Sequence, residues 1–196
     1  MYLQIYILLS HITYYMSCNF LKDYEEDKIQ RKIAYVRSTK NFTLSYIVSI
    51  ILTKMEYHIM PTVNNEWTQD VITFILWLIM AETIFSTMHY LLHKKSLYWI
   101  HKQHHENNPS YSTSSLDCHP IEFLIANVSS IATPMYIFHG SRVLGTFWII
   151  FATINTCYAH SKEGDHMIHH RRFRYNYGQG SYLFDKIMGT YLNKNY

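Results

Sequence analysis

Long apolar runs alternate with polar segments along the chain, and several of the runs have the length of a helix. The clearest run, VITFILWLIMAETIFSTMHYLL (71–92), is long enough to cross a bilayer and contains one acidic residue, Glu82. Two further apolar runs, at 121–138 and 143–159, flank a tight HGSR turn and predict a helical hairpin. The pattern therefore predicts an all-α integral membrane protein with about four transmembrane helices.

The first part of the chain gives a weaker signal. The run at 42–53 spans a bilayer only if Lys54 extends toward the interface and the helix continues to about Met60. Residues 1–18 are apolar but lack the basic start and small-residue cleavage site of a signal peptide, so we expect an anchor or interfacial helix. Residues 19–41 are densely charged, which is typical of a solvated helix or linker.

Basic residues are distributed unevenly, and this predicts an orientation in the membrane. Fifteen of the seventeen Lys and Arg residues lie in 22–40, 94–102 or 162–194, whereas the predicted loop at 61–70 contains none. Cytoplasmic loops carry an excess of Lys and Arg, so we expect these three stretches to face the cytosol. The two hairpin spans return the chain to the same face, so segments on either side of the hairpin can meet.

Composition excludes several other classes of protein. A net charge of +3, with no motif that interleaves basic and aromatic residues, gives no support for nucleic-acid binding. The three cysteines are odd in number and widely spaced, so they predict neither a disulfide framework nor a thiolate zinc site. We expect Cys18, Cys118 and Cys157 to be small buried apolar residues.

Thirteen histidines occur, and most of them lie in closely spaced motifs. HYLLH (89–93) ends the clearest apolar run, and HKQHH (101–105) and HMIHH (166–170) share one HxxHH spacing. Each HxxHH offers a turn-spaced pair, plus an adjacent histidine displaced around the helix that can reach a second metal. So many imidazoles in one region cannot all be protonated, because like charges repel and burial lowers their pKa. Held neutral, each imidazole presents a lone pair that a metal ion can use.

The number and type of the ligands narrow the choice of metal. All-imidazole ligation suits Zn, Fe, Cu or Ni, and the histidines suffice for two ions with four or five ligands each. A structural zinc site closes with four ligands, usually including cysteine, and the HExxH motif of zinc peptidases is absent from the sequence. The single ExxH match, Glu163 to His166, falls short of the two that soluble carboxylate di-iron proteins need. We expect the isolated His11, His58 and His139 to be hydrogen-bonded structural residues.

The order of these motifs identifies a family resemblance. The motifs and their order resemble the fatty acid hydroxylase/sterol desaturase superfamily. They are HYLLH, an eight-residue step to HKQHH, then CHPIE, an apolar hairpin, and HMIHH followed by NYG and DKIMGTY. The resemblance covers about residues 71–192. Within the superfamily, the motifs are most similar to those of sterol C-5 desaturases and next to those of C-4 methylsterol oxidases. The chain departs from the family at two points. Gly164 stands where fatty acid hydroxylases have a second histidine, and only SKEGD separates His160 from HMIHH, where sterol C-5 desaturases have a longer insert.

The resemblance implies a membrane-bound non-haem di-iron enzyme that uses O2 to desaturate or hydroxylate a lipid, with a sterol as the first candidate. It implies a multi-pass protein of the endoplasmic reticulum type with a cytosolic His-rich helical cap. It also implies electrons from NAD(P)H through a cytochrome b5-type donor. We divide the chain into an N-terminal segment (1–41) and a membrane-embedded catalytic domain (42–196). The metal ligands carried over by motif are His89, His93, His101, His104, His105, His119, His160, His166, His169 and His170.

Alternatives remain open at this point. The residues do not decide between an alcohol and an alkene as product, so a fatty acid or sphingolipid hydroxylase and a C-4 methylsterol oxidase are alternatives. A His-rich membrane metal-binding protein is the non-enzyme alternative, although a transporter would place its ligands near the membrane midplane. We expect lipid to reach the metal between the helices of 71–92 and 121–159. Glu82, Tyr177 and Asp185 are candidates for orienting ligands, facing a lipid headgroup or packing a lid, with a purely structural role as the alternative.

Overall fold

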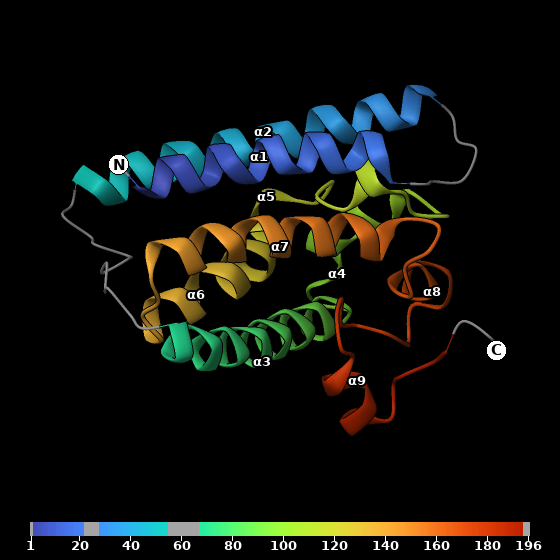
Figure 1. The fold of residues 1–196 in the computed structure, drawn as a ribbon. Coiled ribbons are helices and arrows are strands. Elements are labelled where there is room, and N and C mark those ends of the chain that lie inside the picture. Colours follow the sequence, from blue (N-terminus) through green and yellow to red (C-terminus); the bar gives the residue numbers. More distant parts are fainter. Residues whose placement is uncertain (1, 22–27, 55–66, 194–196) are drawn as a thin grey trace.

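The computed structural model describes residues 2–21, 28–54 and 67–193, and every regular element in these ranges is helical (Figure 1). The described residues do not include three features named above: the extension of the apolar run at 42–53 to Met60, residues 61–66 of the predicted loop, and His58. The elements are α1 (Tyr2–Phe20), α2 (Lys28–Lys54), α3 (Trp67–Leu92), α4 (Tyr98–His101), η1 (His104–Glu106), η2 (Ser112–Ser114), α5 (Pro120–Glu122), η3 (Phe123–Val128), α6 (Ser129–Ile137), α7 (Arg142–His160), α8 (His166–Arg172) and α9 (Leu183–Met188).

The long helices form layers with α7 in the middle. The antiparallel pair α1 and α2 covers one side, α1 packs against α7, and α3 packs against α6 on the other side (Figure 1). Aromatic side chains fill the space between the layers, including Trp77 on α3 and Trp148 on α7, whose rings lie 5.7 Å apart. α2 continues without a break through the expected domain boundary between residues 41 and 42.

The predicted helical hairpin is present. Its first arm runs from α5 through η3 to α6, and its second arm is α7. The η3 segment is π-helical, a form that is rare and often found at functional sites. The turn between the arms is fastened to α3, because Trp77 Nε1 donates to the carbonyl of Phe138 at 2.7 Å and Asp70 accepts from the backbone N–H of Ser141 at 3.1 Å.

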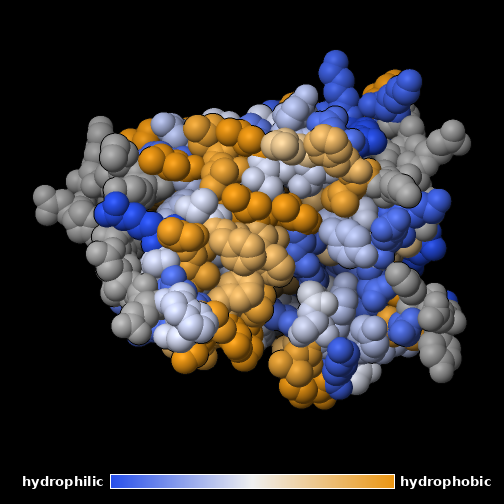
Figure 2. All heavy atoms as spheres, in the orientation of Figure 1, coloured by the Kyte–Doolittle hydropathy of each residue, from blue (hydrophilic) through white to orange (hydrophobic). Residues whose placement is uncertain are grey.

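Two of the described helices are long and apolar enough to cross a membrane, Trp67–Leu92 and Arg142–His160. Only 17% of the apolar window of the first is buried, so most of its side chains face outward, as they do in a lipid-facing helix. Apolar side chains cover much of the visible face over α3, α6 and α7, and hydrophilic ones gather toward the end that contains α8 (Figure 2). The three cysteines are buried, as predicted.

The fold brings the histidine motifs to one end of the helical layers. α3 and α7 both finish at the end where α8 lies, so HYLLH and His160 arrive beside HMIHH (Figure 1). The hairpin returns the chain to that end, as the count of spans predicts. Arg37 of α2 pairs with Glu106 directly after HKQHH, with 2.6 Å between nitrogen and oxygen, so the basic stretch at 22–40 also reaches this end.

Candidate metal centre

Nine of the ten candidate histidines gather into two groups of imidazoles. Within each group the ligand atoms lie within 4.8 Å of one another, which is the spacing that a shared metal ion requires. Group one contains His89, His93, His101, His105 and His169, and group two contains His104, His160, His166 and His170.

Each HxxHH motif supplies both groups, as its spacing predicts. In HKQHH the pair His101 and His105 belongs to group one, and His104 belongs to group two. In HMIHH the roles are exchanged, because the pair at 166 and 170 belongs to group two and His169 belongs to group one. HKQHH does not form one continuous helix, since α4 ends at His101 and the 3-10 turn η1 begins at His104.

His119 lies outside both groups. Its half-buried ring packs against Trp99 at 5.5 Å between ring centroids. Its Nδ1 atom accepts the backbone N–H of Ile121 at 3.2 Å, so it caps the start of α5. Of the isolated histidines, His11 stacks on Phe42 with 4.6 Å between ring centroids, which fits the structural role expected for it.

Four imidazoles donate their Nδ1–H to a backbone carbonyl, which can only accept and so determines their tautomer, and a fifth, His101, pairs its Nδ1 with the carboxyl group of Glu122. A ligand histidine normally donates its second ring nitrogen to a carboxylate or a backbone carbonyl, which turns the other nitrogen toward the metal. In group one the Nδ1–acceptor pairs are His89 with Tyr177 O (2.8 Å), His101 with Glu122 Oε1 (2.8 Å) and His169 with Tyr175 O (2.8 Å). In group two they are His160 with Thr156 O (2.9 Å) and His166 with Asn176 O (3.0 Å) and Gly178 O (2.9 Å).

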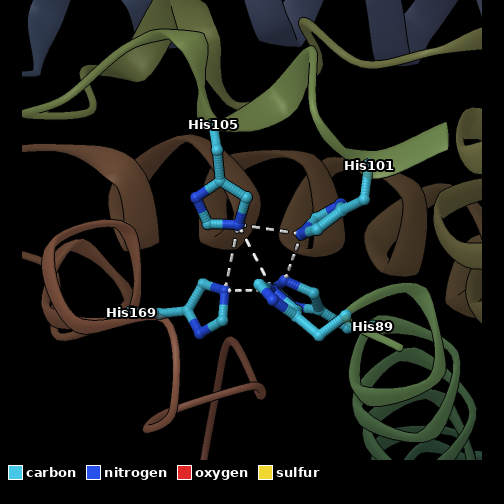
Figure 3. Close-up of side chains that lie close together, drawn as sticks. His89, His101, His105 and His169 are labelled. Carbon is cyan, nitrogen blue, oxygen red and sulfur yellow. Dashed lines mark hydrogen bonds between the residues drawn. The ribbon is translucent and has the colours of Figure 1, made fainter. Parts of the chain in front are cut away.

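The remaining ring nitrogens fit a metal ion. His89 keeps a bare Nε2 atom, which lies 3.0 Å from Nε2 of His101 (Figure 3). Two imidazole nitrogens at this distance are close enough to bind the same metal ion. In group two, His166 Nε2 and both ring nitrogens of His170 are buried without a hydrogen-bond partner among the described residues. Buried polar atoms are seldom left unpaired, so His166 Nε2 and whichever nitrogen of His170 carries no proton are suited to metal ligation.

The imidazoles outside the long helices are held neutral. Burial, with repulsion from neighbouring imidazoles, lowers the pKa of His105 to about 3, and burial lowers the pKa of His93 to about 4. The same two causes, burial first, hold the pKa well below its usual range in five further residues: His101, His104, His166, His169 and His170. These side chains are therefore ready to bind a metal at neutral pH without first losing a proton.

These shifts predict that the metal-free protein loses stability in mild acid. An unfolded histidine takes up its proton near its ordinary pKa of about 6.5, whereas the folded imidazoles resist protonation until about pH 4 or below. Between these values the unfolded state binds more protons, so the free energy of unfolding falls as the pH falls, by up to about 1.4 kcal/mol per pH unit for each histidine. Thermal unfolding in detergent micelles measures this. A Tm that stays constant from about pH 7.5 to about pH 5 would contradict the prediction.

The linker between α7 and α8 is short and folds back on the end of α7. Gly164 N–H donates to the carbonyl of Ser161 at 3.1 Å, and Ser161 N–H donates to Tyr158 at 3.0 Å. A Cβ atom at position 164 would lie 2.2 Å from the carbonyl oxygen of Ala159, so no side chain fits there. The tight linker brings the rings of His160 and His166 to 4.8 Å between centroids, within group two.

A mostly apolar cavity of about 450 Å³ lies beside the imidazoles, between α3, the η3–α6 arm and α7. Phe85 lines it, and its ring lies 5.4 Å from that of His89 and 6.4 Å from that of His166. Glu82 stands at its rim, where it accepts the hydroxyl of Ser181 and the backbone N–H of Leu183, each at 2.5 Å. Lipid access between the helices of 71–92 and 121–159 is the route that the sequence predicts.

Several residues that orient the imidazoles were not identified from the sequence. The carbonyls of residues 175, 176 and 178 and of Thr156 have no side-chain signature, so composition and spacing could not reveal them. Glu122 had a weak signal, because it is the carboxylate of CHPIE. Asp185 contacts no imidazole; it accepts the backbone N–H groups of Tyr177 and Gly178.

The fold and the site together define a protein that is helical throughout its described regular elements and has two imidazole groups beside an apolar cavity. Residues 74–190, more than half of the chain, match the model of the family described as fatty acid hydroxylase. The chain belongs to this family, which confirms the resemblance identified from its histidine motifs.

Curated relatives include three sterol desaturases. The chain is 30% identical over 139 residues to a Delta(7)-sterol-C5(6)-desaturase of Nicotiana tabacum, a match that covers 63% of this chain and 51% of that protein. It is 29% identical over 120 residues to a Delta(7)-sterol 5(6)-desaturase of Leptosphaeria maculans, covering 55% of this chain and 33% of that protein. It is 31% identical over 121 residues to a Delta(7)-sterol 5(6)-desaturase of Aspergillus fumigatus, covering 55% and 36%. The matches thus span between a third and a half of these relatives. No solved structure matches the chain.

Proposed function

We propose that this chain is the catalytic part of a membrane-bound, iron-dependent lipid desaturase or hydroxylase that acts on a sterol. The observation that carries the proposal is the pair of imidazole groups, in which nitrogens with fixed tautomers converge beside an apolar cavity. Family membership supports the reaction class, and the names of the curated relatives favour desaturation of a sterol. A fatty acid or sphingolipid hydroxylase and a C-4 methylsterol oxidase are the alternatives within the class.

In this proposal the nine imidazoles of the two groups hold two iron ions, and His119 stays outside. When bound, iron with O2 supplies the oxidising power to remove hydrogen from an unactivated C–H bond, for which no side chain is reactive enough. The protein's own contribution is to keep the ligands neutral and to fix their orientation. Glu122 and the backbone carbonyls at 175–178 fix the orientation of the ligands by accepting Nδ1–H groups.

The cavity gives the lipid a place next to the imidazoles. Its walls include Ile131 of α6 and Trp148 of α7, apolar side chains that suit a hydrocarbon ring system and exclude water. Phe85 lines the cavity and packs against His89 and His166, so a lipid in the cavity would lie one aromatic ring away from an imidazole of each group. α3 and α7 are the two candidate spans, so a lipid could enter sideways from the bilayer between them.

Four segments cross the membrane in this proposal: the apolar part of α2, α3, the α5–α6 arm and α7. Residues 42–196 form the embedded catalytic domain, and 1–41 form the N-terminal segment. The imidazole end faces the cytosol, as in a multi-pass protein of the endoplasmic reticulum type. Support comes from the exposed basic residues at that end, which cytosolic segments carry in excess: Lys94, Lys95, Lys102, Lys162, Arg171, Arg172 and Arg174.

The same basic residues suit an acidic electron donor. Complementary charge steers such partners into productive encounters and makes association sensitive to salt. We therefore include a cytochrome b5-type protein, reduced by NAD(P)H, as the donor.

Expression in a yeast strain that lacks its own sterol C-5 desaturase tests the proposed function. We expect a C-5 double bond to reappear in the sterols, and about two irons per chain in the purified protein. Sterol and fatty-acid profiling reads the outcome, with the empty vector as control. A new hydroxyl group on a fatty acid or at sterol C-4 would move the assignment to one of the alternatives. Unchanged lipids, with zinc in place of iron in the protein, would contradict the proposal.

A further inference from the structure

Four consecutive residues orient imidazoles of both groups through their backbone. The segment 175–178, here named the carbonyl strap, lies outside the helices between α8 and α9. The carbonyls of Tyr175 and Tyr177 accept from His169 and His89 of group one. The carbonyls of Asn176 and Gly178 accept from His166 of group two. Whatever fixes the carbonyl strap therefore fixes ligands in both groups.

One fully buried carboxylate fixes the middle of the carbonyl strap. Asp185 Oδ1 accepts the N–H of Tyr177 at 2.9 Å, and its Oδ2 accepts the N–H of Gly178 at 2.8 Å. The approach is close, since a Cβ atom on Gly178 would lie only 3.1 Å from Asp185 Oδ2. Thr190 donates its hydroxyl to Oδ1 at 2.7 Å, which adds a third hydrogen bond and helps to offset the cost of burying the charge.

Each oxygen of Asp185 is connected to a different imidazole group by a single peptide unit. The N–H of Gly178 and the carbonyl of Tyr177 belong to one peptide, so Oδ2 holds the peptide whose carbonyl accepts from His89. The N–H of Tyr177 and the carbonyl of Asn176 belong to the preceding peptide, so Oδ1 holds the peptide whose carbonyl accepts from His166. A peptide hydrogen-bonded to an anion on its N–H side becomes a stronger acceptor on its carbonyl side.

We propose that Asp185 is a positioning residue for both imidazole groups at once, acting through these two peptide units. It keeps His89 and His166 in the tautomer with a proton on Nδ1 and points their Nε2 atoms at the metal positions. The inference rests on the proposed metal-binding role of the two groups. It does not depend on which lipid is oxidised.

Cobalt(II) binding and histidine tautomers in the metal-free protein test the proposal together. In the full chain, Asp185→Ala removes both peptide contacts, so we expect the affinity for Co²⁺ to fall about 10-fold or more at both groups, the usual cost of losing a group that orients a ligand. Nitrogen-15 NMR of the metal-free variant should show that His89 and His166 no longer keep the proton on Nδ1. Asp185→Asn keeps one acceptor oxygen and turns an NH2 group toward the other N–H, so it should disturb one of the two histidines.

Two variants serve as controls. Thr190→Val removes a hydrogen bond from the same carboxylate but leaves both peptide contacts, and it should keep both tautomers and both cobalt sites. His170→Ala removes a ligand of group two alone and should leave one tight cobalt site. Circular dichroism reports folding, and if Asp185→Ala does not fold, the NMR spectrum of Asp185→Asn decides. Unchanged tautomers and cobalt affinity in the aspartate variants would overturn the proposal, as would an effect of Asp185→Ala on one group only. A wild-type chain that binds no metal would refute the proposed function, while the tautomers would still test the role of Asp185.

Discussion

Replacing His104 with alanine is expected to abolish lipid oxidation while the helices remain folded. His104 is buried, its Nε2 atom lies 3.1 Å from that of His160, and its ring lies 4.7 Å from that of His170. Without it, group two keeps three imidazoles. Losing a group that merely orients a ligand costs about 10–100-fold in metal affinity or activity, so losing the ligand itself should cost at least about 100-fold.

The His104→Ala experiment measures the oxidised lipid by mass spectrometry and the iron content of the purified protein. We expect the product to disappear and one of two irons to be lost. His139→Ala is the matched control, because this exposed histidine lies in the turn between α6 and α7, outside both groups. Full activity in the His104 variant would show that group two is not part of the catalytic centre.

The sequence predicted the composition of the site better than its internal arrangement. Spacings of three and four residues correctly indicated that each HxxHH motif divides its imidazoles between two groups, because that geometry is local. Which group each pair would join was not predictable: His101 and His105 serve group one, whereas the equivalent pair in HMIHH serves group two. That choice depends on how α4 and η1 are rotated relative to α8, which tertiary packing decides.

The fold shows a similar division between local and long-range information. The hairpin and the shared end of the histidine motifs followed from apolar run lengths and the number of spans. The packing of α1 along α7 did not, because the apolar pattern of α1 does not identify the helix that it contacts. The carbonyl strap was equally hidden, since a backbone carbonyl can orient a histidine from any residue type.

The short linker at 161–165 illustrates a departure from the family pattern that the structure explains. The position four residues after His160, which is a histidine in fatty acid hydroxylases, lies against the final turn of α7. A Cβ atom there would lie 2.2 Å from the carbonyl oxygen of Ala159 and 2.4 Å from that of Tyr158, both of them backbone atoms that cannot rotate away. Glycine is therefore required by the linker, and group two has four imidazoles without a ligand at this position.

Gly164→Ala is accordingly expected to be one of the most damaging single substitutions outside the imidazoles. The added methyl group forces the linker away from α7, which costs about 1–3 kcal/mol for overpacking and lowers the Tm by several degrees. The linker joins His160 directly to His166, so the same shift separates two ligands of group two, and the iron content should fall toward one per chain. Gly180→Ala is the matched control for stability and iron content, because a Cβ atom there meets nothing closer than a Glu82 oxygen at 3.9 Å. If Gly164→Ala kept the wild-type Tm and both irons, the linker would not be what holds His160 against His166.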